Sequence, residues 1–244
     1  MQSTNQRKQI AMLTRRTLLG SVAALPVAAS PVWGQDACAV FTAARQAATT
    51  PDEALQRLKD GNARFVSGKS VNCDLIAQVK ATAGGQAPFA AIVGCIDSRV
   101  PPELVFDQRI GDIFAARIAG NFVNTDIIGS LEFATRLAGA KLIVVLGHTE
   151  CGAIKGAADD ARLGLLTATL ANIRPSVLKV TNVAGERNSK NQAFVQAVAD
   201  QNARDAAALL TEKSDVLLTL VKERKLKVVS AMHDVATGRV SWFG

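Results

Sequence analysis

Two patterns of apolar residues alternate along the chain, and the first is typical of buried strands. Residues 89–95, 112–120 and 141–148 are short, mostly apolar runs that end at polar or glycine-containing turns. Runs of this length and composition favour strands that are covered on both faces of a sheet. A further run at 226–235 also predicts a strand, and GRVSWF (238–243) is predicted to form its hairpin partner.

The second pattern has helical spacing and fills the segments between the predicted strands. A helix is predicted to begin after Thr50, because Pro51 suits the first helical position and Glu53 completes a capping box. Further helices are predicted at 124–139, 161–173 and 191–214. Because strands and helices alternate, the chain is predicted to have an α/β fold with a mostly parallel central sheet flanked by helices.

The first 34 residues lie outside this alternation and are predicted to be an export signal. Arg15 and Arg16 precede a small-residue-rich apolar stretch, 18–30, which Pro26 interrupts. The stretch is too short for a bilayer core of about 30 Å, and the arginine pair indicates the twin-arginine type. Cleavage after residues 28–30 or near residue 34 fits small-residue preferences. An uncleaved membrane anchor and a disordered tail are the alternatives.

This interpretation predicts a bacterial periplasmic protein with no stable membrane association once the signal is removed. Residues 35–244 then form a single globular domain, and a chain with 48% hydrophobic residues can bury a substantial core. The formal net charge is +7, but four of the 28 basic residues lie in the first 30 positions, which hold no acidic residue. The remainder carries +3, and the chain lacks tyrosine, so a nucleic-acid partner is not expected.

Metal-binding residue types follow two of the predicted strands. Cys95 ends one strand and Asp97 follows it, while His148 ends another strand and Cys151 follows three residues later. The carboxyl ends of parallel strands meet at one edge of a sheet, so C-x-D and H-x-x-C are expected to converge. Two thiolates and an imidazole suit tetrahedral zinc, with Asp97 or water as the fourth ligand. A Cys95–Cys151 disulfide is the alternative in an exported protein.

The order and context of these residues resemble the β-class carbonic anhydrases. Three stretches carry the likeness: CIDSRVPPELVFDQRIGDIFAARIAGN, GSLEFA and VVLGHTECGAIKGA. The likeness as a whole extends from about Glu53 to VATGRV (235–240). The resemblance implies that Cys95, His148 and Cys151 hold one zinc ion per subunit in a single catalytic domain, 35–244. It also implies a lyase that reversibly hydrates carbon dioxide to bicarbonate and a proton by zinc-bound hydroxide.

Asp97 and Arg99 match the aspartate–arginine pair of that family. Asp97 is then expected to orient the hydroxide, while Arg99 holds the carboxylate away from the metal through a bidentate ion pair. If the pair breaks, Asp97 can become the fourth zinc ligand and close the site. A plain surface ion pair is the alternative for these two residues.

Departures from the family pattern indicate its permanently open, plant-like members. Members with a bicarbonate-sensitive closed state carry tryptophan where this chain has Ile92, and Gln86 matches a glutamine that binds substrate in the open members. Phe114 and Phe133 match apolar walls of the carbon dioxide pocket, contributed across a dimer interface, although core packing would also explain them. Ile96 stands where many members have serine, and its side chain is expected to point away from the metal.

The resemblance also implies a homodimer or a dimer of dimers, with an N-terminal helix packed on the partner subunit. His233 is expected to be a structural or surface residue rather than a proton shuttle. Cys38 and Cys73 lack ligand spacing and are free or paired. Two other functions stay open: hydrolysis of a sulfur analogue such as carbon disulfide or carbonyl sulfide on the same scaffold, and a non-enzymatic structural zinc or disulfide protein.

Overall fold

The structure is a computed structural model that describes residues 38–243. The predicted export signal and its cleavage site fall outside these residues. All described residues belong to one compact unit. Within this unit, no helix is both long enough and apolar enough to cross a membrane.

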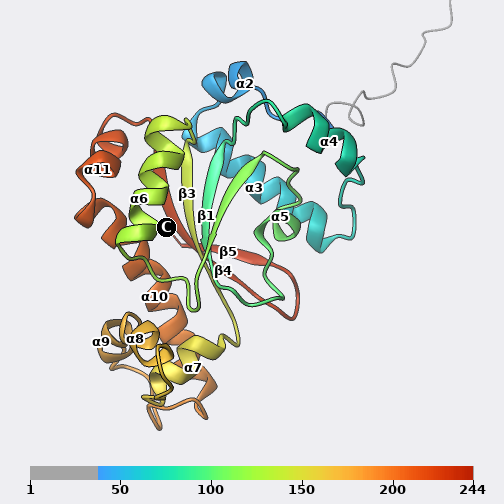
Figure 1. Cartoon of the computed structure of the whole chain (residues 1–244). Coiled ribbons are helices and arrows are strands. Elements are labelled where there is room, and N and C mark those ends of the chain that lie inside the picture. The colour runs from blue at the N-terminus through green and yellow to red at the C-terminus, as the bar shows by residue number, and fades with distance from the viewer. Residues whose placement is uncertain (1–37, 244) are drawn as a thin grey trace, which may run out of the picture. The chain divides into compact units, whose positions relative to one another are not determined.

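In the described residues, a five-stranded sheet with the order β2-β1-β3-β4-β5 forms the centre (Figure 1). The first four strands in this order are parallel to their neighbours, and β5 is antiparallel to β4. The strands are β1 (Ala90–Gly94), β2 (Ile113–Arg117), β3 (Leu142–His148), β4 (Lys227–His233) and β5 (Val240–Phe243). The mostly parallel sheet and the terminal hairpin are therefore confirmed.

β1 and β3 are buried at every position because helices cover both faces of the sheet. On one face, Leu58 of α3 (Pro51–Val66) packs in the same apolar cluster as Ile92 and Val144. On the other, Leu210 of α10 (Gln192–Lys213) packs in a cluster with Val93. Figure 1 shows α3 and α10 on opposite sides of the strands.

The N-terminus of α3 forms as predicted. The Thr50 side chain accepts a hydrogen bond from the Glu53 N–H (3.2 Å), and the Thr50 N–H donates to Glu53 Oε2 (2.8 Å). This capping box satisfies two of the backbone groups that the first helical turn leaves unpaired.

Other helices differ from the predicted ranges. The helix predicted at 124–139 is α6 (Thr125–Glu132), which continues as a π-helical turn, η1 (Phe133–Leu137). The helix predicted at 161–173 is only α8 (Leu166–Ala171), because Gly164 at φ +43° precedes it. Six further helices complete the described fold: α2 (Ala43–Ala48), α4 (Leu75–Thr82), α5 (Pro102–Val105), α7 (Gly152–Ala158), α9 (Arg174–Lys179) and α11 (Asp215–Lys222).

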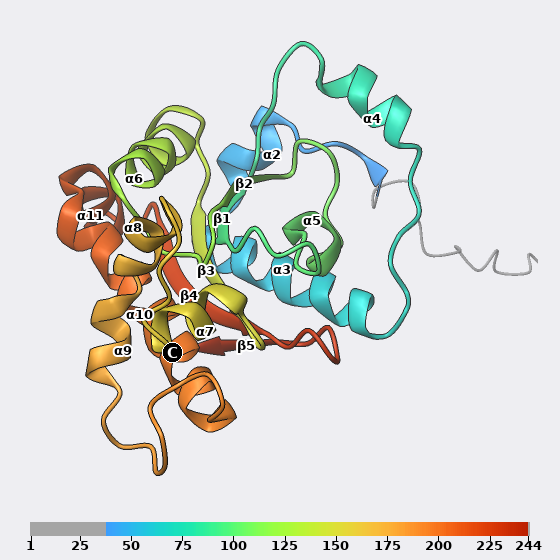
Figure 2. The ribbon, with the colours of Figure 1, turned by 60° about the horizontal axis from the view of Figure 1, so that its bottom comes forward.

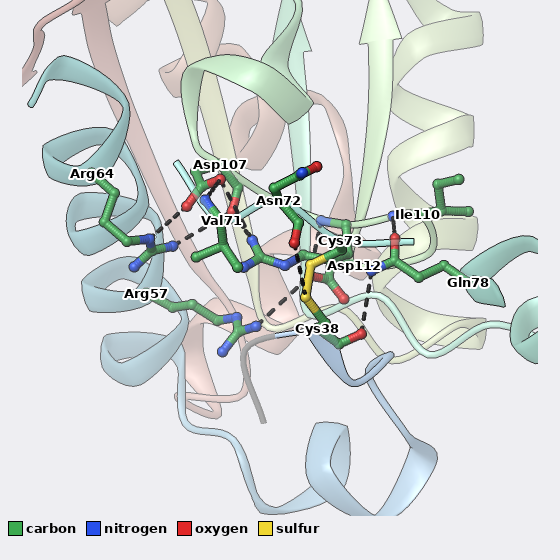
Figure 3. Close-up of a disulfide and its surroundings, with 11 residues drawn as sticks. Cys38, Arg57, Arg64, Val71, Asn72, Cys73, Gln78, Asp107, Ile110 and Asp112 are labelled. Carbon is green, nitrogen blue, oxygen red and sulfur yellow. Dashed lines mark hydrogen bonds and ion pairs between the residues drawn. A yellow bond between two sulfur atoms is a disulfide. The ribbon is translucent and has the colours of Figure 1, made fainter. Parts of the chain in front are cut away.

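Cys38 and Cys73 form a disulfide that ties the start of the described chain to the segment before α4 (Figure 3). Gln78 of α4 donates a hydrogen bond from Nε2 to the Cys38 carbonyl (3.2 Å). The pairing left open by the sequence is therefore resolved in favour of a bridge between these two cysteines.

Candidate metal centre

The two half-sites meet at the carboxyl ends of β1 and β3. Cys95 follows the last residue of β1, and His148 is the last residue of β3, the neighbouring parallel strand. Cys151 lies three residues further on, directly before α7. The ligand atoms of the three residues all lie within 4.8 Å of one another, and all three residues are buried. The predicted convergence of the two half-sites is therefore present.

The geometry fits a metal ion rather than a bridge between the two thiols. Cys95 and Cys151 are free cysteines with sulfurs 4.0 Å apart. Two sulfurs at about 2.3 Å from a tetrahedral zinc lie about 3.8 Å apart. His148 Nδ1 lies 2.9 Å from the Thr149 carbonyl, which places the ring proton on that nitrogen. His148 Nε2 is buried without a hydrogen-bond partner among the described residues, so its lone pair is available to a metal.

The loop after β2 supports the Cys95 thiol from the other side. The Gly120 N–H donates to Cys95 Sγ (3.3 Å), and Asn202 Nδ2 donates to the Gly120 carbonyl (2.8 Å). Gly120 has φ +85°, and a Cβ there would lie 2.4 Å from Ile173 Cδ1. Glycine is strongly favoured at this position, because a side chain would strain the backbone and would require the adjacent isoleucine to shift.

The electrostatics of the centre favour a thiolate on Cys95. The hydrogen bond from Cys151 is the main cause that lowers the pKa of the Cys95 thiol, and His148 and the Gly120 N–H lower it further. The same hydrogen bond and burial raise the pKa of the Cys151 thiol. A thiolate is the form that coordinates metal ions.

Asp97 and Arg99 form the predicted ion pair beside the three ligand residues. Arg99 donates from Nε to Asp97 Oδ1 (2.9 Å) and from Nη2 to Oδ2 (2.7 Å), and its backbone N–H also donates to Oδ1 (3.0 Å). Asp97 Oδ2 lies 3.9 Å from His148 Nε2. The hydrogen bonds from Arg99 hold the pKa of the Asp97 carboxyl well below its usual range, despite partial burial. Asp97 is therefore an ionised acceptor at the edge of the centre.

Arg117, the last residue of β2, also holds this loop and was not singled out from the sequence. Its Nε donates to the Cys95 carbonyl (2.9 Å) and its Nη2 to the Asp97 carbonyl (2.6 Å). Arg117 stands next to Gly94 in the register of β1 and β2. The sequence does carry a signal for Arg117: it is a basic residue at the carboxyl end of β2, the strand next to the one that leads into Cys95.

The three predicted substrate residues lie away from this centre within one chain. Gln86 is exposed in the loop before β1, at the opposite end of the strand from Cys95. Phe114 and Phe133 contact each other edge-on, with ring centroids 6.2 Å apart, and 52% of Phe133 is exposed. These two line a pocket of about 690 Å³ that none of the three ligand residues lines. A single chain therefore does not bring Gln86, Phe114 and Phe133 to the metal ligands, and their roles stay predictions.

Three other residues discussed from the sequence have clear positions. Ile92 is fully buried in β1, and Ile96 is 61% exposed. His233 is buried in β4 and is paired in register with His148, and this burial lowers the pKa of its imidazole to about 4. Its position is that of a structural residue, so the surface alternative is wrong.

The fold and the buried cysteine–histidine–cysteine centre define an α/β metalloprotein of zinc-binding type. The family model described as carbonic anhydrase matches residues 90–240. Carbonic anhydrase 2 of Mycobacterium tuberculosis is 34% identical over 197 residues, which cover 78% of this chain and 92% of that protein. A carbonic anhydrase of Mycolicibacterium smegmatis is 32% identical and covers 79% of this chain and 93% of its own length.

Solved structures agree with this assignment. A β-carbonic anhydrase of Aspergillus fumigatus matches with a TM-score of 0.61 and 26% identity, over 79% of this chain and 89% of that one. One of two β-carbonic anhydrases of Sordaria macrospora, described as tetrameric, matches with a TM-score of 0.58 and 26% identity. The match covers 69% of this chain and 90% of that one. The chain belongs to the carbonic anhydrase family, in its β class. The activity of this family is the zinc-dependent hydration of carbon dioxide to bicarbonate.

Proposed function

We propose that this chain is an open-site carbonic anhydrase in which Cys95, His148 and Cys151 hold zinc and Asp97, fixed by Arg99, orients the reacting water. The observation that carries this assignment is the three-fold hydrogen bonding of Asp97 by Arg99 directly beside the buried ligand set. When bound by such ligands, zinc lowers the pKa of a coordinated water to about 7 and so supplies a nucleophile near neutral pH.

The protein's own residues determine how that water is presented. Asp97 stays ionised because the pKa of its carboxyl is well below its usual range, so it can only accept a hydrogen bond from the water. Accepting that bond directs the oxygen lone pair toward carbon dioxide. Asp97 could ligate the metal itself only by giving up hydrogen bonds from Arg99, so the paired arrangement favours the open state over the closed one.

Metal analysis and carbon dioxide hydration, measured on the same preparations, test these roles. The wild-type protein should contain one zinc per chain, with a zinc-edge spectrum of two sulfurs, one nitrogen and one water oxygen. Cys151→Ser should lose zinc, whereas Asp97→Ala should keep zinc and lose most of the hydration rate. Full hydration by Asp97→Ala would contradict the role of Asp97, and zinc without hydration in the wild type would contradict the proposed function. Carbonyl sulfide hydrolysis, assayed in parallel, tests the sulfur alternative.

We also propose a homodimer, or a dimer of dimers, in which Gln86, Phe114 and Phe133 complete the pocket of the neighbouring subunit. The exposed side chains of η1 support this: Phe133, which contacts Phe114 of the edge strand β2, and Leu137 are apolar, and such side chains are usually covered in an assembly. The tetrameric description of the Sordaria relatives points the same way. Light scattering should give a dimer or tetramer mass, and Phe133→Asp should dissociate it. The exposed Leu163→Asp, in the loop before α8, is the matched control.

We further propose export to the periplasm by the twin-arginine route. The Cys38–Cys73 disulfide supports this, because such bonds persist mainly in oxidising compartments. Residues 1–34 fused to a fluorescent protein should direct fluorescence to the periplasm. Replacing Arg15 and Arg16 together by lysine should retain it in the cytoplasm; equal export of both fusions would contradict the route. Sequencing the mature N-terminus locates the cleavage site.

A further inference from the structure

One polar side chain lies on the buried face of α10. This helix, which the structure describes in full, packs against α7, α9 and the strands β3 and β4, and Figure 2 shows it next to α7 and α9. Positions 198, 202, 206 and 210 follow at four-residue intervals, so they share one face of the helix, and all four are buried. Among the buried side chains of α10 only Asn202 is polar, and it is 3% exposed.

The Asn202 amide has a hydrogen-bond partner that explains its position. Its Nδ2 donates to the Gly120 carbonyl (2.8 Å), although the two residues are 82 positions apart. A carbonyl oxygen can only accept, so the amide nitrogen must face it. An apolar side chain would fill the same space without the cost of burying an amide. The polar residue at this position therefore indicates that its hydrogen bond to the loop after β2 is needed.

Gly120 lies in a turn whose conformation decides where its N–H points. The turn begins at Ile118 and is closed by the Asn121 N–H, which donates to the Ile118 carbonyl (3.0 Å). Gly120 is the third of these four residues and has φ +85°, as in a type II turn. If the peptide before Gly120 turned over, its N–H would point away from Cys95 Sγ, to which it now donates (3.3 Å). The direction of this N–H therefore depends on the turn keeping its shape.

We propose that Asn202 is a positioning residue of the metal centre, which fixes the turn so that the Gly120 N–H stays directed at Cys95 Sγ. The inference rests on the proposed function, in which this sulfur is a zinc ligand. Contacts of this kind behind a ligand orient it and tune its affinity for the metal. Glycine has the greatest backbone freedom of all residues, so a turn built on Gly120 needs a restraint from outside. The hydrogen bond from α10 provides that restraint.

Asn62 of α3 provides a matched control. It is also a buried helical amide, 6% exposed, and its Nδ2 donates to the carbonyls of Val105 and Gly238 (3.0 and 2.9 Å). Asn202→Leu and Asn62→Leu each remove the amide donor at similar volume, so both should lower Tm. Only Asn202→Leu should bind zinc less tightly, by roughly tenfold in chelator competition. If leucine prevents folding, Asn202→Ala and Asn62→Ala give the same comparison without added bulk.

Cobalt substituted for zinc gives a readout that a loss of stability alone does not move. Without the Gly120 N–H, the Cys95 thiolate keeps more charge on its sulfur, so the thiolate-to-cobalt charge-transfer bands of Asn202→Leu should move to lower energy. The bands of Asn62→Leu should match those of the wild type. Unchanged bands and zinc affinity in Asn202→Leu, or equal changes in both variants, would overturn this inference and leave the proposed function intact. A zinc-loaded wild type that does not hydrate carbon dioxide would instead overturn the proposed function, whatever the cobalt spectra show.

Discussion

Replacing Gly120 by alanine tests whether the loop after β2 is a structural requirement of the metal centre. Its φ of +85° is unfavourable for alanine by about 1–2 kcal/mol. The added Cβ would also lie 2.4 Å from Ile173 Cδ1, and overpacking of this kind costs about 1–3 kcal/mol. The sum, about 2–5 kcal/mol, corresponds to a fall in Tm of roughly 4–20 °C for a chain of this size.

Gly68→Ala is the matched control for the backbone term alone. Gly68 has φ +67°, but a Cβ there meets nothing within 4 Å. Calorimetry should therefore show that Gly120→Ala lowers Tm more than Gly68→Ala does. Adding Ile173→Val to Gly120→Ala should recover part of the loss, because it removes the clashing Cδ1.

A second readout connects this loop to the metal. Alanine at position 120 should displace the N–H that donates to Cys95 Sγ, so zinc should be lost to a competing chelator at a lower chelator concentration. Gly68→Ala should bind zinc like the wild type. The reasoning is refuted if the two variants have equal Tm values and equal zinc affinity, because neither the clash nor the hydrogen bond to sulfur would then matter.

Three further predictions concern support of the fold and the centre. Replacing Cys38 and Cys73 together by alanine should lower the free energy of unfolding by about 3–4 kcal/mol, because the bridge closes a loop across a separation of 35 residues. Denaturant titration measures this, and an unchanged denaturation midpoint would contradict the prediction. Asp205 is partly buried, which raises the pKa of its carboxyl, but hydrogen bonds from a lysine, a serine and a glutamine outweigh this and lower it. The unfolded state then binds more protons below about pH 4, so stability should fall as the pH drops through that range, and Asp205→Asn should flatten this slope in acid titrations. Arg117→Met should weaken zinc binding, measured by chelator competition, because it removes the hydrogen bond to the Cys95 carbonyl; affinity equal to the wild type would show that the loop holds its shape without it.

The strands and the ligand set could be predicted because both depend on strong local patterns. Continuous apolar runs mark strands that are covered on both faces, and β1 and β3 are buried throughout. Once those strands are parallel neighbours, Cys95 and His148 must lie at the same edge of the sheet. The capping box at Thr50 was equally readable, because it involves residues only three positions apart.

What the sequence did not reveal depends on contacts between distant residues. The short helices α5, α7 and α9 have four to seven residues, too few for a clear apolar period. Cysteine connectivity cannot be deduced from spacing alone, so the Cys38–Cys73 bridge required the fold. The packing of Leu170 of α8 close to Gly156 of α7 likewise required the fold, since Leu170 looks like an ordinary helix-face residue in the sequence.

In the loop at residues 95–99, the backbone and the Asp97 carboxylate are held by two different arginines. Arg117, from the neighbouring strand, holds the Cys95 and Asp97 carbonyls, so the backbone that carries the ligand is tied to the sheet. The Asp97 carboxylate is held instead by Arg99, whose side chain is 49% exposed. Arg117 is exposed as well, but it donates to neutral carbonyls, whereas the Arg99–Asp97 contact is an ion pair that salt screens. A change of state at this centre should therefore begin at the Asp97–Arg99 pair, while the position of Cys95 stays fixed.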